Sequence, residues 1–245
     1  MTAAGQHPRL YSELAHWWPL LSPPSHYEEE AAELLPRLLA ATDPPPRTLL
    51  ELGCGGGSLA SHLKGDIKLT LTDRSAAMLA QSQRVNPECE HALGDMRSLD
   101  LGRLFDLVLI HDAIDYATDE TAVRETLATA SRHLRSGGAL FILPDHVRET
   151  FKPGTRTGGE DGPDGRALRY LEWTWDPDPT DCTYSAEFAF ILHHPDGTVT
   201  SELDPHVGGL FSRDQWTTWI KEAGFTAAWR VDQWDRCVFE CKRPR

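Results

Sequence analysis

A run of glycines that directly follows a short apolar segment is the feature of this chain that most constrains its fold. Residues 48–52 (TLLEL) predict an apolar strand, and residues 53–57 (GCGGG) follow it without a spacer. Glycines at such a place permit a tight turn and let a ligand touch the backbone, beside the exposed N–H groups at the start of the next helix. Residues 58–64 predict that helix. The sequence thus indicates a ligand-binding strand, turn and helix.

An acidic residue at the end of the next strand narrows the class of ligand. Residues 67–72 alternate as a strand, and Asp73 ends it, twenty residues after Gly53. A carboxylate at this position can accept hydrogen bonds from both hydroxyls of an adenosine ribose. The pattern leaves NAD, FAD and S-adenosylmethionine as candidate ligands.

Three details favour S-adenosylmethionine. The third glycine of the dinucleotide fingerprint is missing, because Ser58 follows the turn. Glu51 stands at the strand end, where a carboxylate suits an ammonium or sulfonium ligand better than a pyrophosphate. After the third predicted strand, Asp95 and Met96 place an acid beside an apolar side chain, which suits the N6 amino group and the ring face of an adenine.

Strands and helices alternate through the first 145 residues. Residues 25–28 fit a capping box for a helix over 29–39, in which Pro36 predicts a kink or an early end. The remaining elements of this part are strands over 90–93, 105–110 and 139–143 and helices over 75–84 and 119–133, the last closed by residues 136–138. Such alternation predicts right-handed βαβ units and a parallel sheet.

The last hundred residues have a different pattern. Residues 152–166 predict a long loop. Strands are predicted over 167–175, 183–193 and 198–203, with a hairpin at Asp196-Gly197, followed by a helix over 212–223 and strands over 226–231 and 236–241. We expect a late antiparallel addition to the parallel sheet, and a small antiparallel cap over its carboxyl edge. The aromatic segment 169–178 either lines an acceptor pocket or packs within the cap.

These motifs together resemble the class I S-adenosylmethionine-dependent methyltransferases, of the type that acts on small molecules. The matching segments are ELGCGGG (51–57), LTLTD (69–73), 75–87, GDM (94–96), FDLVLI (105–110) and LRSGGALFIL (134–143). The resemblance implies a Rossmann-like, doubly wound α/β sheet of seven strands whose last strand is antiparallel. We expect one domain, with lid helices over 1–42, a cofactor-binding core over 45–145, the cap over 165–206, and a C-terminal helix with the last strands over 207–245.

The resemblance also assigns the cofactor-binding side chains. It implies that Asp73 binds the ribose, that Asp95 and Met96 bind the adenine, and that the glycines of the turn line the methionine portion. The predicted cofactor residues are Tyr27, Glu51, Gly53, Gly55, Asp73, Arg74, Met78, Asp95, Met96 and His111.

Both ends of the chain resemble bacterial sugar N-methyltransferases, which act on nucleotide-linked amino sugars. The similar segments are 10–18 with 26–31, and 204–211 followed by a helix. In that group a lid tyrosine and a histidine after the fourth strand approach the acceptor amine. Tyr11 holds the first position, and Tyr116 stands in place of the histidine. The predicted catalytic residues are Tyr11, Asp112, Tyr116 and His206, acting on an amine nitrogen of an amino sugar or another secondary metabolite.

Two alternatives remain open from the sequence. An O-methyltransferase would take a hydroxyl or a carboxylate, and the carboxylate would need an arginine such as Arg148, Arg166 or Arg169 in the cleft. A non-catalytic module would bind S-adenosylmethionine without methyl transfer.

Charge and composition exclude several other classes. The chain has 24 Lys and Arg against 37 Asp and Glu, a net charge of −13, which argues against nucleic acid or anionic lipid as a partner. We find no apolar run of about 20 residues and no signal peptide. Five cysteines without a Cys-x-x-Cys motif predict neither a disulfide framework nor a metal site. We expect a cytoplasmic monomer or homodimer.

Overall fold

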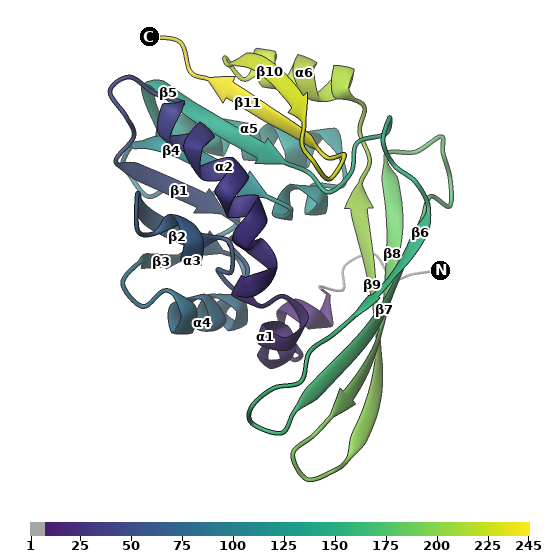
Figure 1. The fold of residues 1–245 in the computed structure, drawn as a ribbon. Coiled ribbons are helices and arrows are strands. Elements are labelled where there is room, and N and C mark those ends of the chain that lie inside the picture. Colours follow the sequence, from purple (N-terminus) through teal and green to yellow (C-terminus); the bar gives the residue numbers. More distant parts are fainter. Residues whose placement is uncertain (1–7) are drawn as a thin grey trace.

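Two sheets organise the computed structural model, which describes residues 8–245 (Figure 1). The strands of the larger sheet are β1 (Thr48–Leu52), β2 (Lys68–Asp73), β3 (Glu90–Leu93), β4 (Phe105–His111), β5 (Leu134–Leu143), β10 (Thr226–Val231) and β11 (Cys237–Lys242). Their order is β10-β11-β5-β4-β1-β2-β3; β1 to β5 are parallel, whereas β11 runs antiparallel to β5 and to β10. The strand order reverses between β4 and β1, and ligands bind at such a switch point in open α/β sheets.

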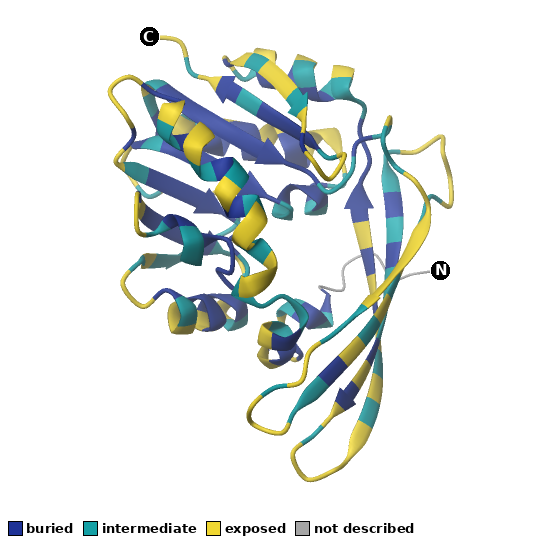
Figure 2. Ribbon diagram, viewed as in Figure 1, coloured by how far each residue is buried: buried dark blue, intermediate teal, exposed yellow. Residues whose placement is uncertain are grey.

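Helices cover both faces of this sheet. They are α2 (Glu28–Ala40), α3 (Ala60–Leu63), α4 (Ala76–Val85), α5 (Glu120–His133), α6 (Arg213–Glu222) and the 3₁₀ turn η4 (Ala113–Tyr116). One core joins the sheet to α5 and α6, and the other joins it to α2, α3 and α4. The middle strands are therefore buried on both sides, as Figure 2 shows, which explains why β4 is an almost continuous apolar run.

The second sheet is the antiparallel cap. It consists of β6 (Gly154–Gly158), β7 (Ala167–Trp175), β8 (Thr183–His193) and β9 (Val199–Gly209), in that order. Between the cap and the core lies the lid: η1 (Arg9–Tyr11), η2 (Ala15–Trp17), α1 (Trp18–Leu21) and η3 (Pro24–Tyr27). Leu10 and Trp17 of the lid pack on Leu168 and Phe190 of the cap. The predicted fold class, with its seven-stranded sheet, cap and lid, is confirmed.

The N-terminal part of α2 differs from the prediction. Residues 25–28 do not form a capping box, because η3 leads directly into α2 and Tyr27 precedes the helix without a side-chain cap. The helix also continues through Pro36. Its buried face, which includes Leu34 and Leu38, packs on the sheet and outweighs the cost of about 3 kcal/mol that a proline imposes on a helix interior.

The strand β5 begins earlier than predicted. Residues 136–138 do not close the preceding helix, since α5 passes into β5 at Leu134. A Cβ atom at Gly138 would lie 2.9 Å from the carbonyl oxygen of Asp106 on β4. The glycines therefore allow the two strands to approach.

The cap contains more strand than predicted. The segment 152–166 is not only a loop, because β6 pairs with β7 as an edge strand whose glycine-rich, exposed residues give no alternating pattern. The third predicted strand, 198–203, extends as β9 to Gly209. Asp204 and His206 consequently lie within this cap strand.

Candidate functional site

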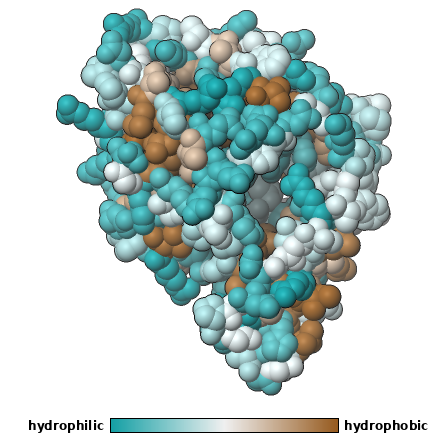
Figure 3. All heavy atoms as spheres, in the orientation of Figure 1, coloured by the Kyte–Doolittle hydropathy of each residue, from teal (hydrophilic) through white to brown (hydrophobic). Residues whose placement is uncertain are grey.

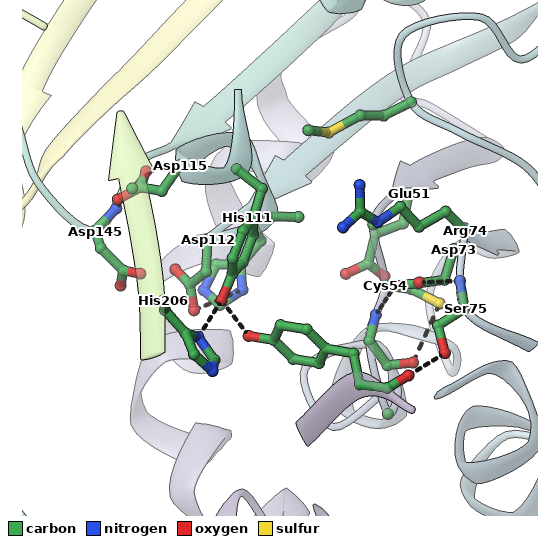
Figure 4. Close-up of a pocket in the computed structure, with 18 of the residues that line it drawn as sticks. Glu51, Cys54, Asp73, Arg74, Ser75, His111, Asp112, Asp115, Asp145 and His206 are labelled. Atoms are coloured by element: carbon green, nitrogen blue, oxygen red, sulfur yellow. Dashed lines mark hydrogen bonds and ion pairs between the residues drawn. The ribbon is translucent and has the colours of Figure 1, made fainter. Parts of the chain in front are cut away.

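A cavity opens at the carboxyl edge of the larger sheet, between the core, the lid and the cap. The space-filling view is hollowed between core and cap, on a face that is mainly hydrophilic (Figure 3). Two ends of the cavity are distinct in Figure 4. We call one the glycine-turn half, defined by Glu51, residues 53–56, residues 73–75 and residues 94–97. We call the other the cap half, defined by Tyr11, Asp112, Ala113, Asp115, Tyr116, Asp145, Glu172 and residues 206–208.

Two glycines of the turn have no room for a side chain. Gly53 has a φ of +79°, and a Cβ atom there would lie 2.3 Å from the Cβ of Ala113. A Cβ atom at Gly56 would lie 2.2 Å from the indole of Trp18, which covers the turn from the lid. The backbone of the turn is thus held between Ala113 of η4 and Trp18 of the lid, and it lines the cavity.

Asp73 ties the end of β2 to the glycine turn. One carboxylate oxygen accepts from the backbone N–H of Gly55 at 3.0 Å, and the other accepts from the N–H of Ser75 at 2.7 Å. Burial raises the pKa of Asp73 above its ordinary value, although these hydrogen bonds oppose the shift. Each oxygen keeps a further lone pair, and the residue lines the cavity, so it can accept from ribose hydroxyls.

Glu51 presents an unmet acceptor to the cavity. Its side chain is only 2% exposed, and Oε2 has no hydrogen-bond partner among the described residues. Burial raises the pKa of Glu51 to about 7. A buried carboxylate oxygen without a partner is costly, and a ligand ammonium group would satisfy it. This feature fits the methionine portion of S-adenosylmethionine.

The carboxylate predicted to bind the adenine is paired with an arginine of the protein. Asp95 forms a two-point ion pair with Arg97, with Nη2 to Oδ2 at 2.6 Å and Nε to Oδ1 at 3.0 Å. Met96 and Arg74 line the same half of the cavity. Met78 does not, because it is fully buried and supports Gly55 from within the core.

His111 and Tyr27 form the wall between the two halves. The ring of Tyr27 meets that of His111 edge-on at 5.9 Å, and its hydroxyl is hydrogen-bonded to Ser22. His111 Nε2 lies 2.8 Å from a carboxylate oxygen of Glu30. Burial alone would lower the pKa of His111, but the charges of Asp112 and Glu30 outweigh it and raise the pKa to about 9.

A chain of four side chains enters the cap half. The Tyr11 hydroxyl lies 2.7 Å from that of Tyr116, which lies 2.8 Å from His206 Nδ1. His206 Nε2 lies 3.0 Å from Asp204 Oδ2. The N–H groups of Arg9 and Leu10 also donate to Asp204, which anchors the lid to the same carboxylate.

The charge of Asp204 sets the direction of these hydrogen bonds. Burial acts to raise its pKa, but the hydrogen bonds from His206 and the lid backbone outweigh burial and lower the pKa. An ionised carboxylate only accepts, so His206 Nε2 carries the hydrogen and Nδ1 accepts from Tyr116. Tyr116 then accepts from Tyr11. A lone pair of the Tyr11 oxygen remains for a ligand in the cavity.

Carboxylates crowd the rest of the cap half. Asp115 accepts from the Tyr184 hydroxyl at 2.9 Å and from the backbone N–H of Asp145 at 3.2 Å. Burial and the neighbouring Asp145 raise the pKa of Asp115 well above its ordinary value. Burial likewise raises the pKa of Glu172, which faces the cavity from β7. A bound cation would favour the ionised forms of these carboxyl groups, which would in turn stabilise the cation.

The arginines considered for a carboxylate acceptor lie elsewhere. Arg148 donates to three backbone carbonyls, Arg166 pairs with Asp164, and Arg169 pairs with Asp161. None of the three lines the cavity.

Asp145 is a residue of the cap half that escaped the sequence analysis. Asp145 follows β5 at the carboxyl edge, where the position alone would have suggested it. In the aromatic segment, Glu172 faces the cavity, whereas Trp173 is half exposed and stacks on Trp175 at 4.3 Å. These two tryptophans do not line the cavity.

Two other kinds of site were sought. In the part of the chain that the structure describes, no group of three or more His, Cys, Asp or Glu side chains is arranged to hold a metal ion. Among residues 8–245, no helix has the length and apolarity needed to span a membrane.

Comparison with known proteins gives a consistent result. Residues 49–138 match the family model described as a methyltransferase domain. A Streptomyces fradiae dTDP-3-amino-3,6-dideoxy-alpha-D-glucopyranose N,N-dimethyltransferase is 28% identical over 82% of this chain and 76% of its own length.

Two solved structures share the fold. Streptomyces venezuelae DesVI has a TM-score of 0.81 and 22% identity, and the alignment covers 95% of this chain and 96% of DesVI. The S-adenosylmethionine-bound amino pentose methyltransferase CalS10 of Micromonospora echinaspora has a TM-score of 0.76 and 23% identity, over 98% of this chain and 99% of CalS10.

Proposed function

The chain contains an S-adenosylmethionine-dependent methyltransferase domain, and we propose that it transfers a methyl group to an amine nitrogen of a small molecule, preferably an amino sugar. The hydrogen-bonded series Tyr11, Tyr116, His206 and Asp204 carries this proposal. An amine arrives as an ammonium ion and must lose a proton before it can attack, and this series gives the proton a destination.

The glycine-turn half is the proposed cofactor site. Glu51 would bind the ammonium group of S-adenosylmethionine, Asp73 the ribose hydroxyls, and Asp95 with Met96 the adenine. Bound there, S-adenosylmethionine supplies an electrophilic methyl group on a sulfonium sulfur. Trp18 of the lid covers the turn and would help to shield the bound methionine portion from water.

The cap half is the proposed acceptor site. The ammonium group of the acceptor donates a hydrogen bond to the Tyr11 oxygen. A proton then moves from the ammonium to Tyr11, while the Tyr11 hydroxyl proton moves to Tyr116 and the Tyr116 hydroxyl proton moves to His206 Nδ1. The imidazolium that forms lies beside the ionised Asp204. The nitrogen would keep its electron pair and form the new N–C bond with it. The bond between the methyl group and sulfur would break at the same time, with its electron pair left on the sulfur of S-adenosylhomocysteine.

The charge of the cap half supports an amine over a carboxylate acceptor. Asp112, Asp145 and Glu172 would stabilise the positive charge on the acceptor nitrogen, before and during transfer. A carboxylate acceptor in the cap half would face these groups, whereas Arg74 and Arg97, the arginines that line the cavity within the described residues, belong to the glycine-turn half. The name of the Streptomyces fradiae relative, an amino sugar N,N-dimethyltransferase, supports an amino sugar as the acceptor.

A turnover screen tests the proposal. The purified protein is first titrated with S-adenosylmethionine by calorimetry, and S-adenosylhomocysteine formation is then measured with matched amine, phenol and carboxylic acid acceptors, including nucleotide-linked amino sugars. We expect cofactor binding, and turnover with amines only. Turnover with acids or phenols alone would contradict the amine proposal, and binding without any turnover would favour a non-catalytic module.

Glu51 should make cofactor binding depend on pH. Its pKa is raised by burial to about 7, and only the ionised form attracts an ammonium group. The affinity for S-adenosylmethionine should therefore rise up to tenfold per pH unit below about pH 7 and level off above it, as calorimetry between pH 5.5 and about 8.5 would measure. The E51Q variant should bind more weakly and show a flat profile. An unchanged slope in E51Q would assign the pH dependence to another group.

A further inference from the structure

The hairpin between β10 and β11 directs the side chain of Arg236 toward Glu30 and Asp112. Arg236 is 18% exposed, and its Nε donates to Asp232 Oδ2 at 2.9 Å. The other oxygen of Asp232 accepts from the Arg236 backbone N–H, and the ring of Trp234 lies 5.3 Å from the guanidinium. The direction of the Arg236 side chain is thus fixed by its own turn.

The guanidinium group of Arg236 contacts helix α2. Its Nη2 donates to Glu30 Oε1 on α2, and the same oxygen lies 2.8 Å from His111 Nε2 at the end of β4. Burial acts to raise the pKa of Glu30, but His111 and Arg236 outweigh it and lower the pKa to about 2. The ionised Glu30 therefore joins two cations from segments that are remote in the sequence.

Asp112 lies against this pair of cations. Its Oδ2 is 3.4 Å from His111 Nδ1, and its Oδ1 is 3.8 Å from Arg236 Nη1. Oδ1 is buried and has no hydrogen-bond partner within residues 8–245. Asp112 has a φ of +55°, a region that favours glycine, so its backbone alone would not select this conformation.

We propose that Arg236 is a positioning residue, which acts from outside the cavity to hold Asp112 ionised and directed at the acceptor amine. The inference rests on the proposed function, in which Asp112 contacts the acceptor. Arg236 itself does not line the cavity, whereas Asp112 and His111 do. Its effect would pass through Coulomb attraction to Asp112 and through Glu30, which orients His111.

The balance of charge around Asp112 explains why this arginine matters. Burial raises the pKa of Asp112, and the charges of Asp145 and Glu30 add to the shift. His111 and Arg236 oppose it. The ionisable and charged groups that face Asp112 are Tyr11, Tyr27, Glu30, His111, Asp115, Asp145 and Arg236. Removal of Arg236 would leave His111 as the one cation of this set.

Direct titration of Asp112 tests the proposal without turnover. Protein labelled with ¹³C at the aspartate carboxyl groups is titrated by NMR, and D112N identifies the Asp112 resonance. R236Q should raise the pKa of Asp112 by about one unit, whereas R236K, which keeps the charge, should restore most of it. R124Q removes an exposed arginine that pairs with Glu120 and Glu222, and it should leave the titration unchanged.

Turnover gives the second measurement. In R236Q the acidic limb of kcat/KM should move to higher pH, with about a tenfold loss of kcat/KM at pH 6, and R236K should keep the wild-type limb. R236Q should add little to D112N, because both changes remove one interaction.

The outcomes separate the two proposals. An Asp112 resonance that titrates alike in R236Q and the wild type, or a loss in R236K as large as in R236Q, would overturn the role of Arg236. If R236Q does not fold, D232N takes its place, because it removes the carboxylate that fixes the Arg236 guanidinium. We expect the pKa of Asp112 to rise in D232N. A wild-type Asp112 pKa in D232N, together with an upward shift in R236K, would likewise overturn the role of Arg236. If the wild type methylates no amine, the proposed function fails, while the NMR titration still decides whether Arg236 controls Asp112.

Discussion

Replacing Tyr116 with phenylalanine is expected to lower kcat for amine methylation by roughly 100-fold, within the range for loss of a general acid–base group. The hydroxyl of Tyr116 joins Tyr11 to His206, with oxygen–oxygen and oxygen–nitrogen distances of 2.7 and 2.8 Å. Phenylalanine keeps the ring between these two side chains but breaks the path of the proton. Steady-state formation of S-adenosylhomocysteine at saturating substrate measures the effect.

The control for Tyr116 is a tyrosine of the cap. Tyr170 on β7 packs against Phe188 and does not line the cavity, so Y170F should change kcat by less than about twofold. Calorimetry should show the same affinity for S-adenosylmethionine in Y116F and the wild type. A Y116F rate within about twofold of the wild type would remove the hydrogen-bonded series from the mechanism.

Replacing Asp73 with alanine is expected to weaken S-adenosylmethionine binding by roughly 10- to 150-fold. Hydrogen bonds to a charged group contribute about 1.5–3 kcal/mol, and each 1.4 kcal/mol is a factor of ten in affinity. Asp73 also accepts from the N–H groups of Gly55 and Ser75, so its loss would loosen the glycine turn as well. Calorimetry at constant pH measures the change.

Asp196 offers a matched control for Asp73. It accepts from the N–H of Thr198 at the exposed hairpin of the cap, a local hydrogen bond of the kind that Asp73 makes with Ser75. D196A should bind S-adenosylmethionine as the wild type does. Equal affinities in D73A and D196A would place the cofactor away from Asp73.

The parallel strands of the core and the residues at their carboxyl edge were predictable from the sequence, because the patterns that indicate them are local. Most of the parallel strands are short apolar runs, and a side chain at the carboxyl end of such a strand, such as Glu51 or Asp73, must lie at the carboxyl edge of the sheet whatever the rest of the chain does. The same rule would have identified Asp145 after β5. The side chain of Met78 could not be placed from the sequence, because a helical methionine near a glycine turn can face either the cavity or the core; in the structure it is buried.

The cap half depends on long-range pairing, which the sequence did not determine. A shift of one residue in strand register exchanges the two faces of a strand. Because β7 is partly buried on both faces, its sequence does not show that Glu172 faces the cavity and Trp173 faces outward. His206 reached the cavity only because β9 pairs with β8 along its whole length. Arg236 meets Glu30 across 206 positions, and no local pattern indicates such a contact.

The central claim is that the methyl group of S-adenosylmethionine is transferred to an amine nitrogen. The most direct measurement uses S-adenosylmethionine labelled with ¹³C in the methyl group and a nucleotide-linked amino sugar that carries both an amine and free hydroxyls. The ¹³C NMR spectrum of the product separates N-methyl from O-methyl carbons. We predict that the label appears only on nitrogen, and a signal on an oxygen, with none on nitrogen, would contradict the account.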